Sequence, residues 1–216
     1  MELTLRRLLI AICLATLAVP AATASSQALP RVTLIGDSVA GALNLEPRAR
    51  AYLGRGIDLR VDAKVCRRLA ETSCPYRGVR PPTALETIQD AGAALGSVVI
   101  IDLGYNDGPA DYAAGIDPVM RALGGAGVEV VVWVTLGEEV NPALYRKTNT
   151  MIDQAARRWE SIVVADWEKR SRGRRWFAED GLHLNAVGTM GLARLLRPLV
   201  VAAACGGTCS RVGGAR

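Results

Sequence analysis

The chain has 216 residues, of which half are hydrophobic and 22% are charged, with a formal net charge of +5. This composition is typical of a globular protein and excludes long-range disorder and a collagen-like fibre. The charge is mild and no basic block is interleaved with aromatic residues, so the sequence does not indicate a nucleic-acid-binding protein. A length near 200 residues favours one domain with its own core.

The first 24 residues have the pattern of a secretory signal peptide. Arg6 and Arg7 precede an apolar run over residues 8–22, and Ala22-Thr23-Ala24 has the small-x-small pattern of a cleavage site. The run is short for a spanning helix, which needs about 20 apolar residues. We therefore predict a signal peptide over residues 1–24 and a secreted or extracytoplasmic protein without a later membrane span. An uncleaved N-terminal anchor is the alternative.

The rest of the chain alternates short apolar runs with longer mixed segments. The runs rich in Val and Ile predict strands at Arg31–Ile35, Ile57–Asp62, Val98–Leu103, Val128–Thr135 and Ile162–Asp166. The mixed segments predict helices at Val39–Leu53, Pro82–Leu95, Tyr112–Gly124, Pro142–Trp159 and about Asn185–Ala203, the last disturbed at Pro198. This alternation predicts one α/β/α sandwich over residues 31–204 with five parallel strands. Residues 25–30 and 205–216 are expected to be tails.

Four cysteines follow the predicted signal peptide: Cys66, Cys74, Cys205 and Cys209. An even number in an exported chain indicates two disulfides, for which three connectivities are possible. We prefer the local pairs Cys66–Cys74 and Cys205–Cys209, because each pair lies in a segment with loop-forming residues. The cysteine spacings are poor for zinc, and we expect no metal.

Polar residues gather directly after the predicted strands, where ligands bind in folds of this class. Ser38 follows the first strand, Asn106 follows the third, and Asp180 and His183 precede the last helix. A serine needs a base to become a strong nucleophile. His183 is the only histidine of the chain, and Asp180 lies three residues before it, close enough to orient the imidazole. With the Asn106 amide as an oxyanion donor, these residue types are those needed for acyl transfer.

Three motifs carry a specific resemblance. GDSVA at 36–40, GYND at 104–107 and DGLHL at 180–184 resemble blocks one, three and five of the SGNH (GDSL-type) hydrolase superfamily. The resemblance implies a flavodoxin-like three-layer sandwich and no cofactor. It implies that Ser38 is the nucleophile, His183 the general base and Asp180 its orienting carboxylate. The Ser38 backbone N–H and Asn106 would be two oxyanion donors.

The second block departs from the family pattern. The family has a glycine there whose backbone N–H is the third oxyanion donor, and this chain has Cys66 at that position, before Arg67 and Arg68. The N–H donor survives this change, but a side chain would crowd the pocket or require a different backbone dihedral. A Cys66–Cys74 bridge would hold the loop in place. A free thiol nucleophile is the alternative.

Other residues are weaker candidates. We predict Asp37, Tyr105, Asp107 and Trp176 as substrate-binding residues, with a turn-fixing, loop or core role as the alternative for each. Residues 169–175 carry five positive charges, which indicate either a solvated loop or a site that attracts an anionic glycan or lipid.

Together these patterns predict an exported serine hydrolase of carboxylesterase or acetylesterase type. The expected substrate is an oxygen ester, with an O-acyl group on a cell-envelope saccharide as the narrower hypothesis. A non-catalytic glycan-binding module of the same fold and an O-acyltransferase are the alternatives. The sequence does not predict the oligomeric state.

Overall fold

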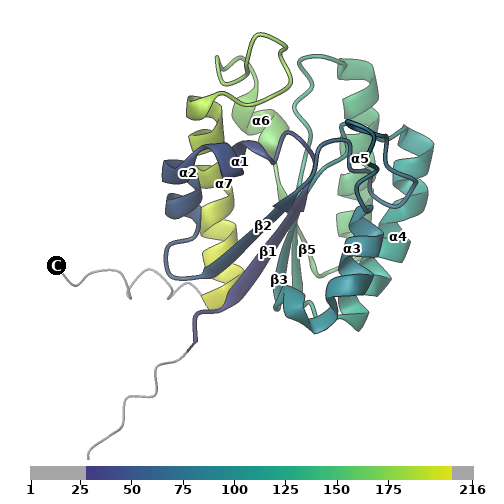
Figure 1. The fold of residues 1–216 in the computed structure, drawn as a ribbon, viewed down its shortest axis with the longest axis vertical. Helices are drawn as coiled ribbons and strands as arrows, with labels where there is room; N and C mark the ends of the chain where they lie inside the picture. Colours follow the sequence, from purple (N-terminus) through teal and green to yellow (C-terminus); the bar gives the residue numbers. More distant parts are fainter. Residues whose placement is uncertain (1–27, 206–216) are drawn as a thin grey trace, which may run out of the picture.

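The computed structural model describes residues 28–205. Its centre is a sheet of five parallel strands in the order β2-β1-β3-β4-β5 (Figure 1). The strands are β1 (Arg31–Gly36), β2 (Asp58–Ala63), β3 (Val98–Asp102), β4 (Val130–Val134) and β5 (Ile162–Ala165). All five predicted strands are confirmed. After β2 the chain crosses over β1 to reach β3, so β1 and β3 are neighbours and the loops that follow these two strands lie next to each other.

Helices cover both faces of the sheet (Figure 1). One face carries α1 (Ala42–Leu45), α2 (Pro47–Leu53) and α7 (Ala186–Cys205), with α6 (Trp167–Ser171) packed on α7. The other carries α3 (Ala84–Ala91), the 3₁₀ helix η1 (Gly92–Leu95), α4 (Pro109–Gly125) and α5 (Pro142–Arg158). The predicted three-layer sandwich is confirmed.

Side-chain alternation along the strands divides the core in two. In the fully buried strand β3, Val98 and Ile100 belong to the core under α1, α2 and α7, whereas Val99 and Ile101 belong to the core under α3, α4 and α5. Successive side chains of a strand point to opposite faces, so a strand covered on both sides is apolar throughout. Runs rich in Val and Ile therefore predict the strands of this sheet.

The helices differ from prediction where proline or capping sets a boundary. The helix predicted over Val39–Leu53 is two helices, α1 and α2, which meet at Glu46. Pro47 occupies the first position of α2, where its missing N–H costs nothing. Thr83 and Glu86 form a capping box that begins α3 at Ala84. Helix α6 includes the first three residues of the basic segment 169–175, for which the charge pattern predicts a solvated loop as one interpretation.

Helix α7 continues through Pro198, so the predicted disturbance there does not end it. Within the described residues, α7 alone is long and apolar enough to cross a membrane by length and composition. Its Leu192, Leu196 and Val200 are buried in the core with the sheet. The predicted signal peptide, Cys209 and residues 206–216 lie outside the described part of the chain.

Candidate active site

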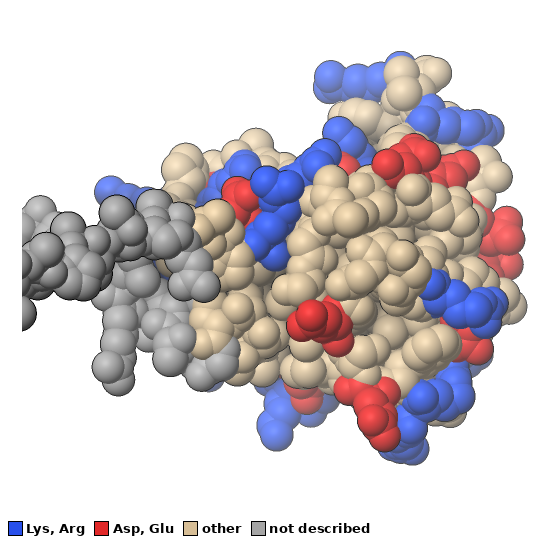
Figure 2. All heavy atoms as spheres, turned by 90° about the horizontal axis from the view of Figure 1, so that it is seen from below, with Lys and Arg blue, Asp and Glu red and all other residues tan. Residues whose placement is uncertain are grey.

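The residues of the three motifs meet at the carboxyl-terminal edge of the sheet. Ser38 lies in the turn after β1, Asn106 lies in the loop after β3, and Asp180 and His183 lie in the segment before α7. Figure 1 shows these loops at the top of the molecule, where the strand arrows end. The opposite end appears in Figure 2, where acidic and basic side chains are scattered over a mostly uncharged surface.

Ser38, His183 and Asp180 form a continuous chain of short contacts. His183 Nε2 lies 3.0 Å from Ser38 Oγ, and His183 Nδ1 lies 2.7 Å from Asp180 Oδ2. With the ring proton on Nδ1, the carboxylate accepts it and Nε2 faces the serine hydroxyl as an acceptor. The three residues therefore have the geometry of a nucleophile, a base and an orienting carboxylate.

The Asp180 carboxylate is stabilised in its ionised form. Its hydrogen bond with the His183 ring, followed by those from the backbone N–H groups of Leu182 and His183, lowers its pKa to about 2. Both backbone donors lie 2.9 Å from Oδ1. The Asp180 carboxylate is therefore ionised at neutral pH.

A short hairpin holds His183 in place. Phe177 and Leu184 form an antiparallel bridge, and Ala178 N–H donates to the His183 carbonyl over 2.7 Å. Leu184 is buried in the core, while the neighbouring His183 side chain is 43% exposed. The hairpin thus anchors one residue in the core and presents the next one to Ser38.

Asp37 joins the first loop to the third from a fully buried position. Its Oδ1 accepts from Val39 N–H at 2.9 Å, and its Oδ2 accepts from Gly104 N–H at 3.2 Å and Tyr105 N–H at 3.3 Å. Burial raises the pKa of Asp37 to about 6, although these hydrogen bonds oppose the shift. Asp37 thus has a turn-fixing role in place of the predicted substrate contact.

Cys66 retains the backbone conformation for which a glycine is usually needed. Its φ is 67°, in the left-handed region that side chains disfavour. It forms the predicted disulfide with Cys74, and Cys74 N–H donates to the Cys66 carbonyl over 3.3 Å. The alternative of a different dihedral at Cys66 is therefore wrong, and so is that of a free thiol.

Arg67 is a buried anchor whose role the sequence reasoning missed. Its guanidinium group donates to the Pro82 carbonyl at 3.0 Å and to the Asp62 carbonyl at 2.6 Å, and it pairs with the Asp62 carboxylate at 3.2 Å. The Arg67 carbonyl accepts from Asn106 Nδ2 at 3.2 Å. Since an amide NH₂ has two hydrogens, one of them remains for a ligand. No local pattern in the sequence indicates these partners, which lie up to 39 residues away.

Tyr105 and Asp107 also connect loops. Tyr105 Oη accepts from Gly137 N–H at 2.8 Å, and its ring packs edge-on against Tyr145. Asp107 is buried and accepts from Leu69 N–H at 3.0 Å. Burial raises the Asp107 pKa to about 6. The position of Asp107 supports a loop-fixing role in place of the predicted substrate contact. Tyr105 is half-buried, so its predicted role in substrate binding stays a prediction.

Trp176 lies away from this cluster of contacts. Its ring stacks on Trp167 with centroids 5.7 Å apart, and it packs against Gly188 and Gly191 of α7. A side chain at either glycine would collide with Trp176. These contacts support the alternative of a core role for Trp176, and its predicted role in substrate binding is not part of the Ser38–His183 geometry.

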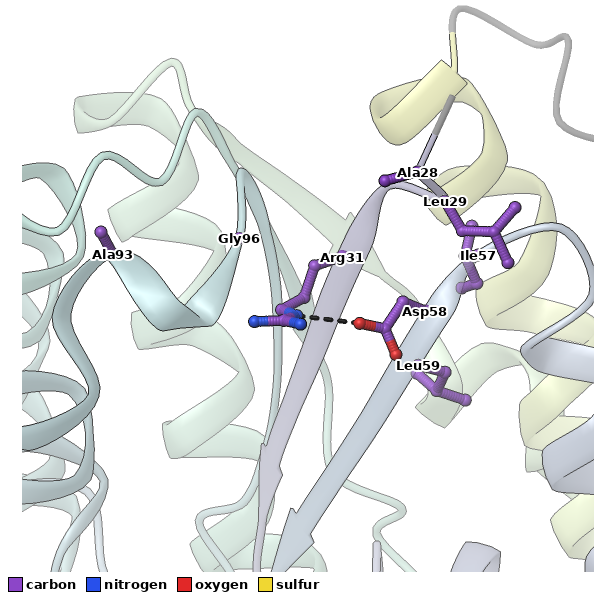
Figure 3. Close-up of a pocket in the computed structure, with 8 residues that line it drawn as sticks. All are labelled: Ala28, Leu29, Arg31, Ile57, Asp58, Leu59, Ala93 and Gly96. Carbon is purple, nitrogen blue, oxygen red and sulfur yellow. Dashed lines mark hydrogen bonds and ion pairs between the residues drawn. The ribbon is translucent and has the colours of Figure 1, made fainter. Parts of the chain in front are cut away.

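A cavity of about 580 Å³ lies at the other end of the sheet. It lies where β1 and β2 begin, and Arg31 and Asp58 form an ion pair of 2.9 Å at its side (Figure 3). Both side chains are half exposed, so this ion pair contributes little to the stability of the fold. Within residues 28–205, no group of three or more His, Cys, Asp or Glu residues is placed to hold a metal ion.

Comparison with known proteins finds similarity in structure. No protein-family model and no curated protein matches the chain. Among solved structures, TesA is 18% identical with a TM-score of 0.60, over 79% of this chain and 97% of its own. A carbohydrate acetylesterase family member from Sinorhizobium meliloti is 18% identical with a TM-score of 0.59, over the same shares. A two-domain esterase active on acetylated mannans is 15% identical with a TM-score of 0.51, over 77% of this chain and 47% of its own.

These likenesses extend over most of the described chain, and they concern the arrangement of its strands and helices. The chain therefore has the fold of the SGNH (GDSL-type) hydrolases, and the resemblance predicted from its three motifs is confirmed at the level of the fold.

Proposed function

We propose that this protein is a serine esterase that hydrolyses oxygen esters through an acyl-enzyme on Ser38. The observation that carries the proposal is the contact chain from Ser38 Oγ through His183 to Asp180, with distances of 3.0 and 2.7 Å. A serine hydroxyl, an imidazole and a carboxylate in this order are the parts of a nucleophilic acyl-transfer site.

In the first half-reaction, Ser38 Oγ attacks the ester carbonyl while His183 Nε2 takes the hydroxyl proton. Asp180 stabilises the imidazolium that forms. When the tetrahedral intermediate collapses, the C–O bond to the leaving alcohol breaks and His183 returns the proton to that oxygen. Water then attacks the acyl-enzyme with His183 again as the base, which releases the acid and restores Ser38.

Three donors support the negative oxygen of the intermediate in this proposal. They are the backbone N–H groups of Ser38 and Cys66 and the free amide hydrogen of Asn106. Neither backbone N–H has a hydrogen-bond partner among residues 28–205, so both are available to a ligand. The left-handed conformation of Cys66 keeps a glycine-like backbone at the position where the family has its third donor.

The narrower proposal is an exported enzyme that acts on O-acyl groups of cell-envelope saccharides. The Cys66–Cys74 disulfide supports export, because disulfides persist in oxidising compartments. Two structures of similar fold are described as esterases of carbohydrates or acetylated mannans, which supports the glycan substrate by analogy of fold.

The test is hydrolysis of p-nitrophenyl acetate, butyrate and octanoate by the disulfide-intact protein. We expect turnover in the wild type, a loss of at least about 1,000-fold in Ser38→Ala and His183→Ala, and a preference for acetate. Ser161→Ala is the matched control, since Ser161 lies between α5 and β5 and is not among the residues of the site.

Two results would contradict the proposal. A folded wild type without turnover that still binds saccharides would indicate the glycan-binding module. A wild type that transfers acetyl groups to sugar hydroxyls but not to water would indicate the O-acyltransferase.

A further inference from the structure

A second hollow lies on the face of the sheet covered by α2 and α7, lined by residues of both helices. It has a volume of about 350 Å³, within the usual range for small-ligand sites. Its lining includes Arg48 of α2, Arg170 of α6, Arg194 of α7 and Trp176. We call it the arginine pocket.

The arginine pocket has an excess of positive charge. Arg48, Arg170 and Arg194 are exposed, and none of them forms an ion pair within residues 28–205. Glu46 is the acidic residue in the lining. Because like charges held together repel, an anion placed between these guanidinium groups would lower the free energy of the pocket. Arginine also matches carboxylate and phosphate groups with two parallel hydrogen bonds.

Trp176 holds part of this charge in position. The guanidinium carbon of Arg170 lies 5.7 Å from the centre of its ring, and that of Arg174, outside the lining of the pocket, lies 5.6 Å from it. A cation over an indole face is held by cation–π attraction. Met190 and Val187 add apolar surface, and Val187 is 62% exposed. A ligand with both anionic groups and C–H faces would complement this lining.

The chain connects the arginine pocket to both halves of the Ser38–His183 site. After Ser38, the chain enters α1 and then α2, which carries Arg48. After His183, it enters α7, whose first residues Ala186 and Val187 line the pocket. Asn185 N–H also donates to the Trp176 carbonyl at 3.0 Å, which ties the pocket to the hairpin of His183. Ser38, Asp180 and His183 are not among the residues that line the pocket, so a ligand that contacts both places must extend beyond the pocket.

We propose that the arginine pocket binds a saccharide unit bearing a carboxylate or phosphate group, as part of a glycan whose ester lies at Ser38. The location of the ester rests on the proposed function, but binding to the pocket does not require turnover. A polymer of this kind fits the combination of unpaired arginines, apolar C–H surface and an extended path. It also gives the basic segment 169–175 a role beyond that of a solvated surface.

Binding is measured by isothermal titration calorimetry with the Ser38→Ala protein, so that no ester is consumed. The probes are tetragalacturonate and phosphomannan, with uncharged maltotetraose and poly-L-glutamate as references. We expect at least one acidic saccharide to bind and both references to bind at least tenfold more weakly. In Ser38→Ala with Arg48→Glu and Arg194→Glu, binding should weaken at least tenfold.

The matched control is Ser38→Ala with Lys147→Glu and Arg157→Glu, which changes the net charge equally. Both residues are exposed on α5, on the opposite face of the sheet, and binding should change less than twofold. Circular dichroism and thermal unfolding check that each variant is folded. Because the substituted side chains are exposed, we expect little change in stability.

Several outcomes would overturn the proposal. Absence of binding to both acidic saccharides, equal weakening in the control variant, or equal binding of poly-L-glutamate would each do so. Binding to phosphatidylglycerol vesicles through the same arginines, without saccharide binding, would assign the pocket to a lipid surface instead. Failure of the esterase proposal appears separately, as a lack of p-nitrophenyl ester turnover by the wild type.

Discussion

The segment that carries Asp180 and His183 lies at the surface, whereas the residues that shape the oxyanion side are buried. The side chains of Asp180 and His183 are 50% and 43% exposed, but those of Asp37 and Arg67 are 0% exposed. Asp180 contacts residues two and three positions away, while Asp37 and Arg67 join loops that are far apart in the sequence.

The two sides meet different physical demands. A proton relay exchanges protons with water and ester substrate, so it is placed where solvent reaches it. An oxyanion hole is effective when its donors need no reorganisation as charge develops. Buried ions with several hydrogen bonds provide that rigidity, since their loss leaves costly unpaired groups. We therefore expect changes on the exposed side to affect activity alone, and changes on the buried side to affect stability as well.

The largest expected effect is on the exposed side. Asp180→Asn should lower kcat for p-nitrophenyl acetate by roughly 1,000- to 10,000-fold, because the orienting carboxylate is lost. The free energy of unfolding, measured with urea, should fall by less than about 1 kcal/mol, because exposed ion pairs contribute little. A loss of stability comparable to that of a core substitution would contradict the expectation that the exposed side affects activity alone.

The next effect is on the buried side. Arg67→Ala should lower the free energy of unfolding by about 3–5 kcal/mol, since Asp62 and two carbonyls lose their partner. Arg31→Ala is the matched control, because its ion pair with Asp58 is half exposed and worth less than about 1 kcal/mol. Equal urea midpoints for the two variants would show that Arg67 is not an anchor.

Asn106→Ala should lower both the activity and the stability of the protein. Loss of one oxyanion donor should lower kcat by roughly 100- to 1,000-fold with little change in KM. Loss of the bond to the Arg67 carbonyl should lower stability by about 1 kcal/mol. Steady-state kinetics and urea unfolding measure both quantities. An unchanged kcat would remove Asn106 from the proposed oxyanion hole.

The buried carboxyls predict a pH effect on stability. Burial raises the pKa of Asp102 from 3.8 to about 8, and one of its oxygens has no hydrogen-bond partner among residues 28–205. Between these values the unfolded chain loses the proton and the folded chain keeps it, so stability is lost as the pH rises. Relative to the wild type, Asp102→Asn should therefore gain at least about 1 kcal/mol between pH 5 and pH 8. A difference that is independent of pH in urea unfolding would contradict this.

The smallest effect concerns the backbone at Cys66. Two variants without the disulfide are compared: Cys66→Gly with Cys74→Ala, and Cys66→Ala with Cys74→Ala. Because φ is 67° at this position, the glycine variant should be more stable by about 1 kcal/mol. It should also keep more esterase activity. Equal stability of the two variants would mean that the loop does not need the left-handed conformation.

The exposed side of the site was the more predictable one. Asp180 and His183 are three residues apart, so their spacing in the sequence predicts their contact. Because ligands bind at the carboxyl ends of parallel strands, the sequence also predicts that His183 lies near Ser38. The five strands were also predictable, because burial on both faces makes them apolar throughout.

The buried side was less predictable for the same reason. The partners of Arg67 and Asp37 come from distant loops, and a sequence pattern gives no sign of which charges will be buried together. The division of the first predicted helix at Glu46 depends on Pro47, which begins α2. Proline at this position favours a new helix start, whereas the apolar pattern over Val39–Leu53 favours one continuous helix. The left-handed conformation of Cys66 was not predicted, because side chains disfavour it and the sequence does not show what holds the loop in it.

The central claim is that Ser38 is the nucleophile and that His183 activates it. The most direct measurement is labelling of the disulfide-intact protein with a fluorophosphonate, followed by intact mass and peptide mapping. We predict one adduct, on Ser38, formed by the wild type and by Ser161→Ala but not by His183→Ala. No adduct on a folded wild type, an adduct on another residue, or undiminished labelling of His183→Ala would contradict the claim.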